Sequence, residues 1–158
     1  MQPVALGGFM GTGKTTVGRK LAERLQFPFV DTDEVLVQRY GPIASQFAEW
    51  GEETFRAHER EVVLEHCDNK LRVLATGGGV WTSESLRWYL RESAYFCVVL
   101  TAPFEVLARR IQASGRPLVS VARELYDQRQ QAYADADLRL DTHDLSEDQV
   151  IEAILCRL

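Results

Sequence analysis

The residues of this chain best suited to chemistry lie near its N-terminus, in the segment Gly8-Phe-Met-Gly-Thr-Gly13-Lys14-Thr15. The spacing Gly-x-x-x-x-Gly-Lys-Thr follows an apolar run and opens a helical pattern, a context typical of a loop that binds nucleotide phosphates. Glycines let backbone N–H groups turn toward the phosphates, the lysine reaches the β- and γ-phosphates, and the Thr15 hydroxyl suits Mg²⁺. We therefore predict nucleotide binding by Gly11, Thr12, Gly13, Lys14, Thr15 and Thr16.

This motif leaves the reaction open. A glycine-rich turn from strand to helix can also be a packing device, although the Lys14-Thr15 pair has no packing function there. Proteins that carry such a loop include switches, motors and kinases. The choice among them depends on residues elsewhere in the chain.

Two carboxylates follow the next apolar run, in Asp31-Thr32-Asp33. The carboxyl ends of strands in an open parallel sheet face the ligand crevice, so both carboxylates could face the nucleotide. One suits Mg²⁺ coordination through water, and the other could hold an attacking hydroxyl or take its proton. The alternative for Asp33 is that it caps the N-terminus of the helical run Glu34–Tyr40.

A possible anion clamp follows in Phe55-Arg56-Ala-His-Glu59, where Arg56 and Glu59 are three residues apart and share one face of a helix. Arg56 could bind a carboxylate while Glu59 holds it in place. The alternative is an ordinary surface ion pair, which is common and weak. The glycine triplet Gly77-Gly78-Gly79 comes directly after another strand pattern and allows a ligand to approach the backbone closely.

Two further arginines could reach the same crevice. Arg116-Pro117-Leu118 lies in a connecting segment, and a mobile loop that carries an arginine can close over a transferring phosphoryl group. Arg129 lies in the next helical pattern, four residues before Tyr133. Either arginine could instead point into solvent.

The elements that must position these residues alternate between strand and helix. Apolar, β-rich runs occur at Val4–Phe9, Phe29–Val30, Val73–Ala75, Tyr95–Leu100 and Leu138–Leu140, with helical patterns between them. Such alternation predicts a parallel sheet covered by helices on both faces. Residues 33–69 form a long helical insertion, broken at Gly41-Pro42 and Gly51, that could hold a substrate-binding subdomain. We expect the last helix, Ser146–Arg157, to begin with a capping box and only to cover the sheet.

Composition excludes several classes of protein. The 158 residues suit one domain, and the net charge of −5 disfavours a nucleic-acid binder. No apolar run approaches the roughly 18–20 residues that span a bilayer, so we expect no membrane partner. The three cysteines show no metal-binding spacing, and we expect reduced, mostly buried thiols. We also expect a cytosolic protein that acts as a monomer.

Together these motifs, in this order along essentially the whole chain, resemble the shikimate kinase family of P-loop proteins. The resemblance implies a three-layer α/β fold with a five-stranded parallel sheet in the order 2-3-1-4-5. It also implies a substrate-binding insertion at about residues 33–69 and a lid at about 112–123. The implied activity transfers the γ-phosphoryl group of ATP to the 3-hydroxyl of shikimate, with Mg²⁺ as cofactor and ADP and shikimate 3-phosphate as products.

The resemblance also implies roles for individual residues. Arg56 and Arg129 match the two arginines that grip the shikimate carboxylate. Asp33 and the N–H of Gly78, within the loop formed by Gly77, Gly78 and Gly79, match the groups that hold the ring hydroxyls. Phe47 and Phe55 match aromatic residues of the substrate pocket.

The remaining implied roles concern ATP and the metal. Thr15 matches a direct Mg²⁺ ligand, and Asp31 matches a residue that reaches the metal through water. Arg116 matches the lid arginine near the γ-phosphate, so Lys14, Asp33 and Arg116 are the candidate catalytic residues. Arg110 matches an arginine that stacks on adenine, with the adjacent Arg109 as the alternative.

Some features depart from the family pattern. The lid is short, the stretch Thr142-His143-Asp144-Leu145 lacks the proline and arginine of some members, and no acidic residue ends the third strand. A related kinase for gluconate or a nucleoside monophosphate is the alternative enzyme. A nucleotide-binding regulator without kinase activity is the alternative from another class.

Overall fold

The computed structural model describes residues 1–115 and 120–158 and contains a parallel sheet of five strands. The strand order is β2-β3-β1-β4-β5, as the resemblance implied. The strands are β1 (Val4–Gly8), β2 (Phe29–Asp31), β3 (Val73–Ala75), β4 (Phe96–Thr101) and β5 (Leu138–Asp141).

The register of the sheet brings three strand ends to one edge. Val4 of β1 lies opposite Val73 of β3 and Phe96 of β4, and Asp31 of β2 lies opposite Ala75 of β3. Because all strands run in the same direction, the segments after β1, β2 and β3 emerge side by side. These segments are the phosphate-binding motif, the Asp31–Asp33 segment and the glycine triplet.

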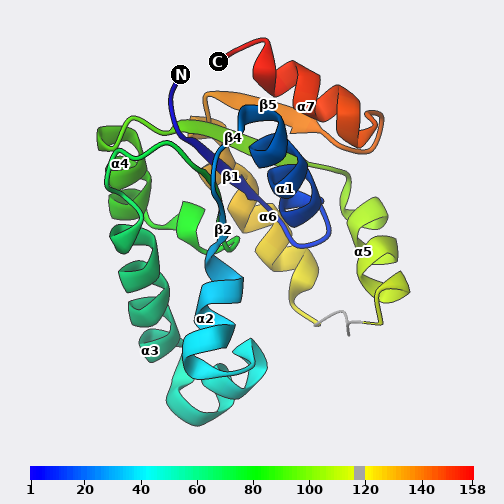
Figure 1. The fold of residues 1–158 in the computed structure, drawn as a ribbon. Helices are drawn as coiled ribbons and strands as arrows, with labels where there is room; N and C mark the ends of the chain where they lie inside the picture. Colours follow the sequence, from blue (N-terminus) through cyan, green and yellow to red (C-terminus); the bar gives the residue numbers. More distant parts are fainter. Residues whose placement is uncertain (116–119) are drawn as a thin grey trace.

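Helices cover both faces of the sheet (Figure 1). They are α1 (Lys14–Leu25), α2 (Thr32–Tyr40), α3 (Ile43–Glu65), α4 (Glu84–Glu92), α5 (Phe104–Ala113), α6 (Ala122–Ala132) and α7 (Glu147–Leu155), with short 3₁₀ turns at Val80–Thr82 and Tyr133–Asp135. On one face, α1 and α7 pack against alternate residues of β1 and β4, such as Leu6 and Val98. On the other face, α3 and α4 pack against the residues between them, such as Ala5 and Val99. The predicted layers are therefore confirmed.

The start of α2 excludes the alternative in which Asp33 caps this helix. Asp31 is the N-cap, and its Oδ1 accepts a hydrogen bond from the Asp33 N–H at 3.0 Å. The helix therefore begins at Thr32, one residue after the strand ends, and Asp33 lies in its first turn. Asp33 is not the cap, so its carboxylate is left for another function.

The insertion breaks where the sequence predicts. Gly41-Pro42 separates α2 from α3, and Gly51 interrupts α3 with φ 79° and ψ 173°. This region of the backbone map is open almost only to glycine. The break lets α3 change direction, and Arg56 and Glu59 in its second part lie against the glycine triplet. The α2 helix and the start of α3 project away from the sheet (Figure 1).

Several predicted strand boundaries were wrong by one residue, among them both ends of β4. Tyr95 does not join β4, because its N–H donates to the carbonyl of Leu90 at 3.0 Å and so closes α4. Thr101 does join β4, where it pairs with Asp141 of β5. The partner that places Thr101 in β4 is distant in sequence, so this boundary could not be predicted from the local run.

The cysteines are all free, as expected, but their burial was only partly predicted. Cys97 is buried, Cys67 is half-buried and Cys156 is exposed at the end of α7. Burial raises the pKa of the Cys97 thiol to about 12. Within residues 1–115 and 120–158, no helix has the length and apolar character needed to span a bilayer.

The conformation of Gly51 leads to a stability prediction. A Cβ at this position would meet no other atom within 4 Å, so its cost is purely conformational. We expect Gly51→Ala to lower the free energy of unfolding by about 1–3 kcal/mol, measured by urea denaturation. Ser45→Ala, at an exposed helical position in α3, is the control and should change it by less than about 0.5 kcal/mol. Equal stability of the two variants would contradict the prediction.

Candidate active site

The predicted phosphate-binding motif forms the loop between β1 and α1. The ammonium group of Lys14 folds back over this loop and donates to the carbonyls of Gly8 at 2.7 Å and Phe9 at 3.1 Å. Thr12 is buried, and its hydroxyl donates to the Phe9 carbonyl at 2.8 Å. The loop therefore holds its own shape at the N-terminus of α1, where backbone N–H groups favour an anion.

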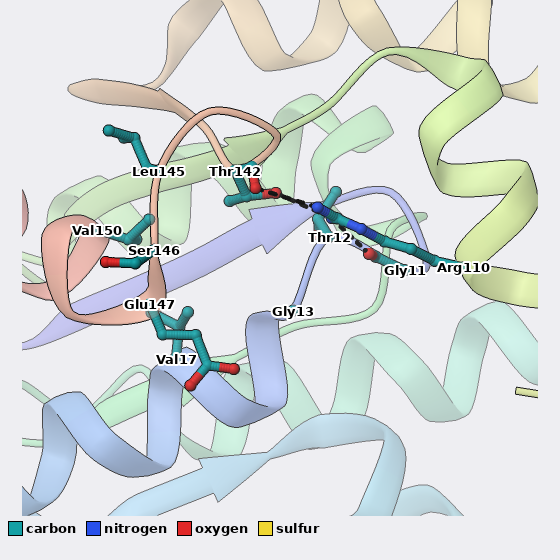
Figure 2. A pocket seen from close by; sticks show the side chains of 10 residues that line it. All are labelled: Gly11, Thr12, Gly13, Val17, Arg110, Thr142, Leu145, Ser146, Glu147 and Val150. Atoms are coloured by element: carbon teal, nitrogen blue, oxygen red, sulfur yellow. Dashed lines mark hydrogen bonds between the residues drawn. The ribbon is translucent and has the colours of Figure 1, made fainter. Parts of the chain in front are cut away.

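A cavity of about 390 Å³ lies on one side of this loop, and Figure 2 shows its lining. It is lined by Gly11, Thr12, Gly13, Val17, Arg110, Thr142, Leu145, Ser146, Glu147 and Val150. Ser146 is the N-cap of α7 in the predicted capping box, and Glu147 and Val150 lie in that helix. The start of the last helix therefore lines this cavity in addition to covering the sheet.

Arg110 bridges the two sides of this nucleotide-side cavity. Its guanidinium donates to the Gly11 carbonyl at 3.1 Å, to the Thr142 hydroxyl at 3.2 Å and to the Thr142 carbonyl at 3.1 Å (Figure 2). Arg109 is exposed and does not line the cavity. Of the two neighbouring arginines, only Arg110 therefore has the position for a nucleotide contact.

Thr15 and Asp31 lie together at the edge of the phosphate-binding loop, where the Thr15 hydroxyl donates to the Asp31 carboxylate at 2.7 Å. A hydroxyl and a carboxylate are oxygen donors of the kind that Mg²⁺ prefers. No group of three or more His, Cys, Asp or Glu in the described ranges could hold a metal ion. Two protein oxygens fit a Mg²⁺ that takes its other ligands from phosphates and water.

A second cavity of about 730 Å³ lies on the other side of the loop, and we call it the acceptor cavity. The predicted residues that line it are Lys14, Asp33, Phe47, Phe55, Arg56, Gly77, Gly78, Gly79 and Arg129. The lining is completed by Glu59 and by six residues that no motif had indicated: Met10, Ile43, Ala44, Glu52, Val121 and Leu125. Isolated apolar residues carry no motif, although Ile43 and Ala44 lie four and three residues before Phe47 on one helical face.

The Arg56–Glu59 pair is not an ordinary surface pair. Arg56 Nη1 lies 2.8 Å from Glu59 Oε2, and the Glu59 side chain is only 4% exposed. Glu52 approaches the Arg56 Nε at 3.7 Å from the solvent side. The pair aims the guanidinium at the acceptor cavity, and a buried carboxylate that lost its partner would carry a large energetic cost.

The glycine triplet brings the backbone against these charged groups. A Cβ at Gly77 would lie 2.9 Å from Asp33 Oδ1 and from Glu59 Oε1, and one at Gly78 would lie 2.6 Å from Arg129 Nη1. A Cβ at Gly79 would overlap the Arg56 guanidinium. The triplet is needed for this close approach.

The environment of Asp33 changes its acidity. Burial is the main reason that the pKa of its carboxyl group rises from 3.8 to about 6, and the nearby carboxylates of Asp31 and Glu59 add to the rise. Lys14 and Arg56 act in the opposite direction. A carboxylate with a pKa near 6 can accept a proton near neutral pH.

Arg129 faces the acceptor cavity rather than solvent. Its guanidinium lies over the ring of Phe9, 5.3 Å from the centroid. Tyr133 is buried in the core beside α4, and it does not line the cavity. The candidate lid residue Arg116, with Pro117 and Leu118, lies outside the described residues.

These features define a class of protein. The phosphate-binding loop separates two cavities, with Gly11–Gly13 facing one and Lys14 facing the other. A loop of this kind, with a candidate Mg²⁺ site and a second cavity lined by arginines and a carboxylate, is the arrangement of a P-loop phosphotransferase.

Comparisons with known proteins identify the family. The family model described as shikimate kinase matches residues 10–158. A shikimate kinase from Geobacter sulfurreducens is 42% identical over 159 residues, which cover 96% of this chain and 87% of that protein. The chain belongs to the shikimate kinase family.

Solved structures agree with this assignment. The structure of shikimate kinase from Acinetobacter baumannii in complex with shikimate has a TM-score of 0.88 at 34% identity, covering 98% of this chain and 91% of that one. A gluconokinase from Sinorhizobium meliloti has a TM-score of 0.66 at 19% identity, covering 99% of this chain and 94% of that one. The second likeness shows a shared fold alone, so the gluconate alternative gains no support from it.

The bridge made by Arg110 leads to a binding prediction. Arg110→Ala removes the contacts that join Gly11 to Thr142, and we expect it to weaken ADP binding about fivefold to thirtyfold, or about 1–2 kcal/mol. Isothermal titration calorimetry with ADP measures the change. Arg109→Ala removes the same charge from the adjacent position and should leave the affinity within about twofold. An equal loss of ADP affinity in the two variants would contradict the prediction, because it would show that the positive charge matters and the position of Arg110 does not.

Proposed function

We propose that this protein transfers the γ-phosphoryl group of ATP to the 3-hydroxyl of shikimate and forms ADP and shikimate 3-phosphate. One observation carries the proposal: two arginines, a carboxylate and a glycine loop face one cavity beside Lys14. This cavity offers groups for the carboxylate and the hydroxyls of shikimate, and Lys14 for the phosphoryl group that ATP donates. Membership of the shikimate kinase family supports the choice of substrate.

Arg56 and Arg129 would bind the carboxylate of shikimate. Both guanidinium groups line the acceptor cavity, and a guanidinium can bind a carboxylate through two parallel hydrogen bonds. Such local positive charge lets a protein with a net charge of −5 select an anionic substrate. Phe47 and Phe55, whose ring centroids are 4.4 Å apart, would pack against the ring and limit its orientation.

Asp33 would hold the attacking hydroxyl, together with the Gly78 N–H. Its carboxylate lies in the acceptor cavity beside Lys14, which would lie near the γ-phosphate. In phosphoryl transfer, positioning and charge stabilisation supply most of the rate enhancement. Asp33 would orient the hydroxyl and accept its proton as the new bond forms.

ATP would place its base in the nucleotide-side cavity beside Arg110 and its phosphates against Gly11–Thr16. Thr15 and Asp31 would hold the Mg²⁺, which supplies charge neutralisation for the phosphates. We propose Arg116 as the lid residue that adds positive charge near the γ-phosphate. Closing such a lid would exclude water from the transferred group.

The carboxylate clamp can be tested with matched arginine variants. We expect shikimate-dependent ADP release from the parent protein, with no comparable release for gluconate or nucleoside monophosphates. Arg56→Ala should raise the shikimate KM at least about thirtyfold, or about 2 kcal/mol, and leave the ATP KM within about twofold. Arg60→Ala, one turn further along α3, is the control because Arg60 donates to Ser85 at 2.7 Å and does not line the acceptor cavity.

Two results would count against the proposal. Absence of shikimate-dependent ADP release would exclude the activity, and release with none of the substrates would favour a regulator. An equal rise of both KM values in Arg56→Ala would contradict the placement of Arg56 in the clamp. Thermal denaturation shows whether each variant remains folded.

The raised pKa of Asp33 leads to a pH prediction. At saturating MgATP, kcat/KM for shikimate should rise with pH and level off above about pH 6, because the base must be ionised and its pKa is about 6. Asp33→Asn should lower kcat by at least about a hundredfold and remove this acid limb. If kcat/KM for Asp33→Asn still fell at low pH, the fall would arise from the protonation of another group.

The same titration can be followed without substrate. The folded protein holds the Asp33 proton more tightly than the unfolded chain, since the pKa rises from 3.8 to about 6 on folding. The contribution of Asp33 to the free energy of unfolding therefore falls as the pH rises from about 4 to about 6. Asp33→Asn should be more stable than the parent at pH 7.5, and this difference should shrink toward pH 4.

A further inference from the structure

Thr32 lies between the two carboxylates of Asp31 and Asp33 but does not share their surroundings. Its side chain is fully buried, and it lines neither the nucleotide-side cavity nor the acceptor cavity. The Thr32 hydroxyl oxygen accepts a hydrogen bond at 3.2 Å from the backbone N–H of Gly77. Thr32 thus connects the first turn of α2 to the first residue of the glycine triplet.

This bond continues the pairing of two segments past the end of their strands. The ladder between β2 and β3 ends at the pair Asp31 and Ala75, and the buried hydrogen bond between Thr32 and Gly77 lies beyond it. A buried N–H without a partner costs more free energy than the bond itself contributes, so the hydroxyl strongly favours one position of Gly77.

The other end of the glycine loop is fixed to β1. The N–H and the hydroxyl of Thr76 both donate to the Leu6 carbonyl, at 3.0 and 3.1 Å. The indole N–H of Trp81 donates to the Thr76 hydroxyl oxygen at 2.8 Å. Thr76 therefore ties the loop to the strand that leads into the phosphate-binding loop, whereas Thr32 ties it to the segment that carries Asp33.

The position of Gly77 matters because the acceptor groups pack against it. Asp33 Oδ1 and Glu59 Oε1 would each lie 2.9 Å from a Cβ at Gly77, which is closer than ordinary van der Waals contact. A shift of Gly77 by even a few tenths of an ångström would change the space available to both carboxylates. Glu59 in turn holds Arg56 at 2.8 Å.

We propose that Thr32 is a positioning residue that fixes the glycine loop in register with Asp33 and so sets the geometry of the acceptor cavity. The proposal rests on the proposed function, in which Asp33 and the glycine loop hold the hydroxyls of the acceptor. Thr32 touches no reacting atom and acts through Gly77. Its contribution should therefore appear in the parameters of the acceptor and not in those of ATP.

The test compares variants with and without the hydroxyl. Thr32→Val keeps the shape of the side chain and leaves the Gly77 N–H without its acceptor, whereas Thr32→Ser keeps the hydroxyl. We expect Thr32→Val to raise the shikimate KM roughly tenfold with the ATP KM within about twofold. Thr32→Ser should restore the shikimate KM to within about threefold of the parent value. Thr32→Ala also lacks the hydroxyl and gives the same selective rise if Thr32→Val does not fold.

A core variant separates positioning from general destabilisation. Ile154→Val shortens a fully buried side chain of α7, on the opposite face of the sheet from the glycine loop, and should lower Tm without changing either KM. An unchanged shikimate KM in the variants without the hydroxyl would overturn the proposal. Equal rises of the shikimate and ATP KM values would also overturn it, and so would a Thr32→Ser variant as impaired as Thr32→Val.

These outcomes are separate from failure of the proposed function. If the parent protein shows no shikimate-dependent ADP release, the proposed function fails, and the positioning role fails with it. If the parent is active and Thr32→Val matches it, only the role of Thr32 is excluded. The parent assay therefore precedes the comparison of variants.

Discussion

The acceptor side of this protein depends on three consecutive positions that carry no side chain. At Gly77, Gly78 and Gly79, charged groups of distant residues occupy the space where Cβ atoms would stand. A methyl group at any of the three would push away a carboxylate or a guanidinium. The cavity is therefore shaped by backbone that lies directly against ionic groups, and its charges cannot move independently of the loop.

Close packing of charges requires that they balance. Glu59 is almost completely buried and is compensated by Arg56, which keeps the guanidinium directed toward the cavity. Asp33 lies near Asp31 and Glu59 as well as Lys14 and Arg56, and burial dominates the net effect on its pKa. Loss of one partner would leave another buried charge uncompensated, so the site is built as a unit. Such pre-arranged charge is what phosphoryl transfer requires, because little covalent chemistry is left to the protein.

The sheet supplies the common frame for both cavities. The phosphate-binding loop, the Asp31–Asp33 segment and the glycine triplet leave neighbouring parallel strands at the same edge. Hydrogen bonds of Thr32 and Thr76 extend this alignment beyond the ladder. The nucleotide-side cavity uses the other half of the sheet, where Arg110 joins the phosphate-binding loop to the segment after β5.

The sequence by itself determined the local features of this protein: the phosphate-binding loop, the strand–helix alternation and the breaks at Gly41-Pro42 and Gly51. These follow from spacing and from the backbone preferences of glycine and proline, which act over a few residues. The strand order and the roles of individual residues toward shikimate also came from the sequence, but only through resemblance to a family. Asp31 rather than Asp33 as the cap, Arg110 rather than Arg109 at the nucleotide-side cavity, and the burial of Glu59 were decided by the tertiary structure. Each depends on a neighbour supplied by a distant segment or by the packing around it, and spacing along one chain cannot reveal which neighbour that will be.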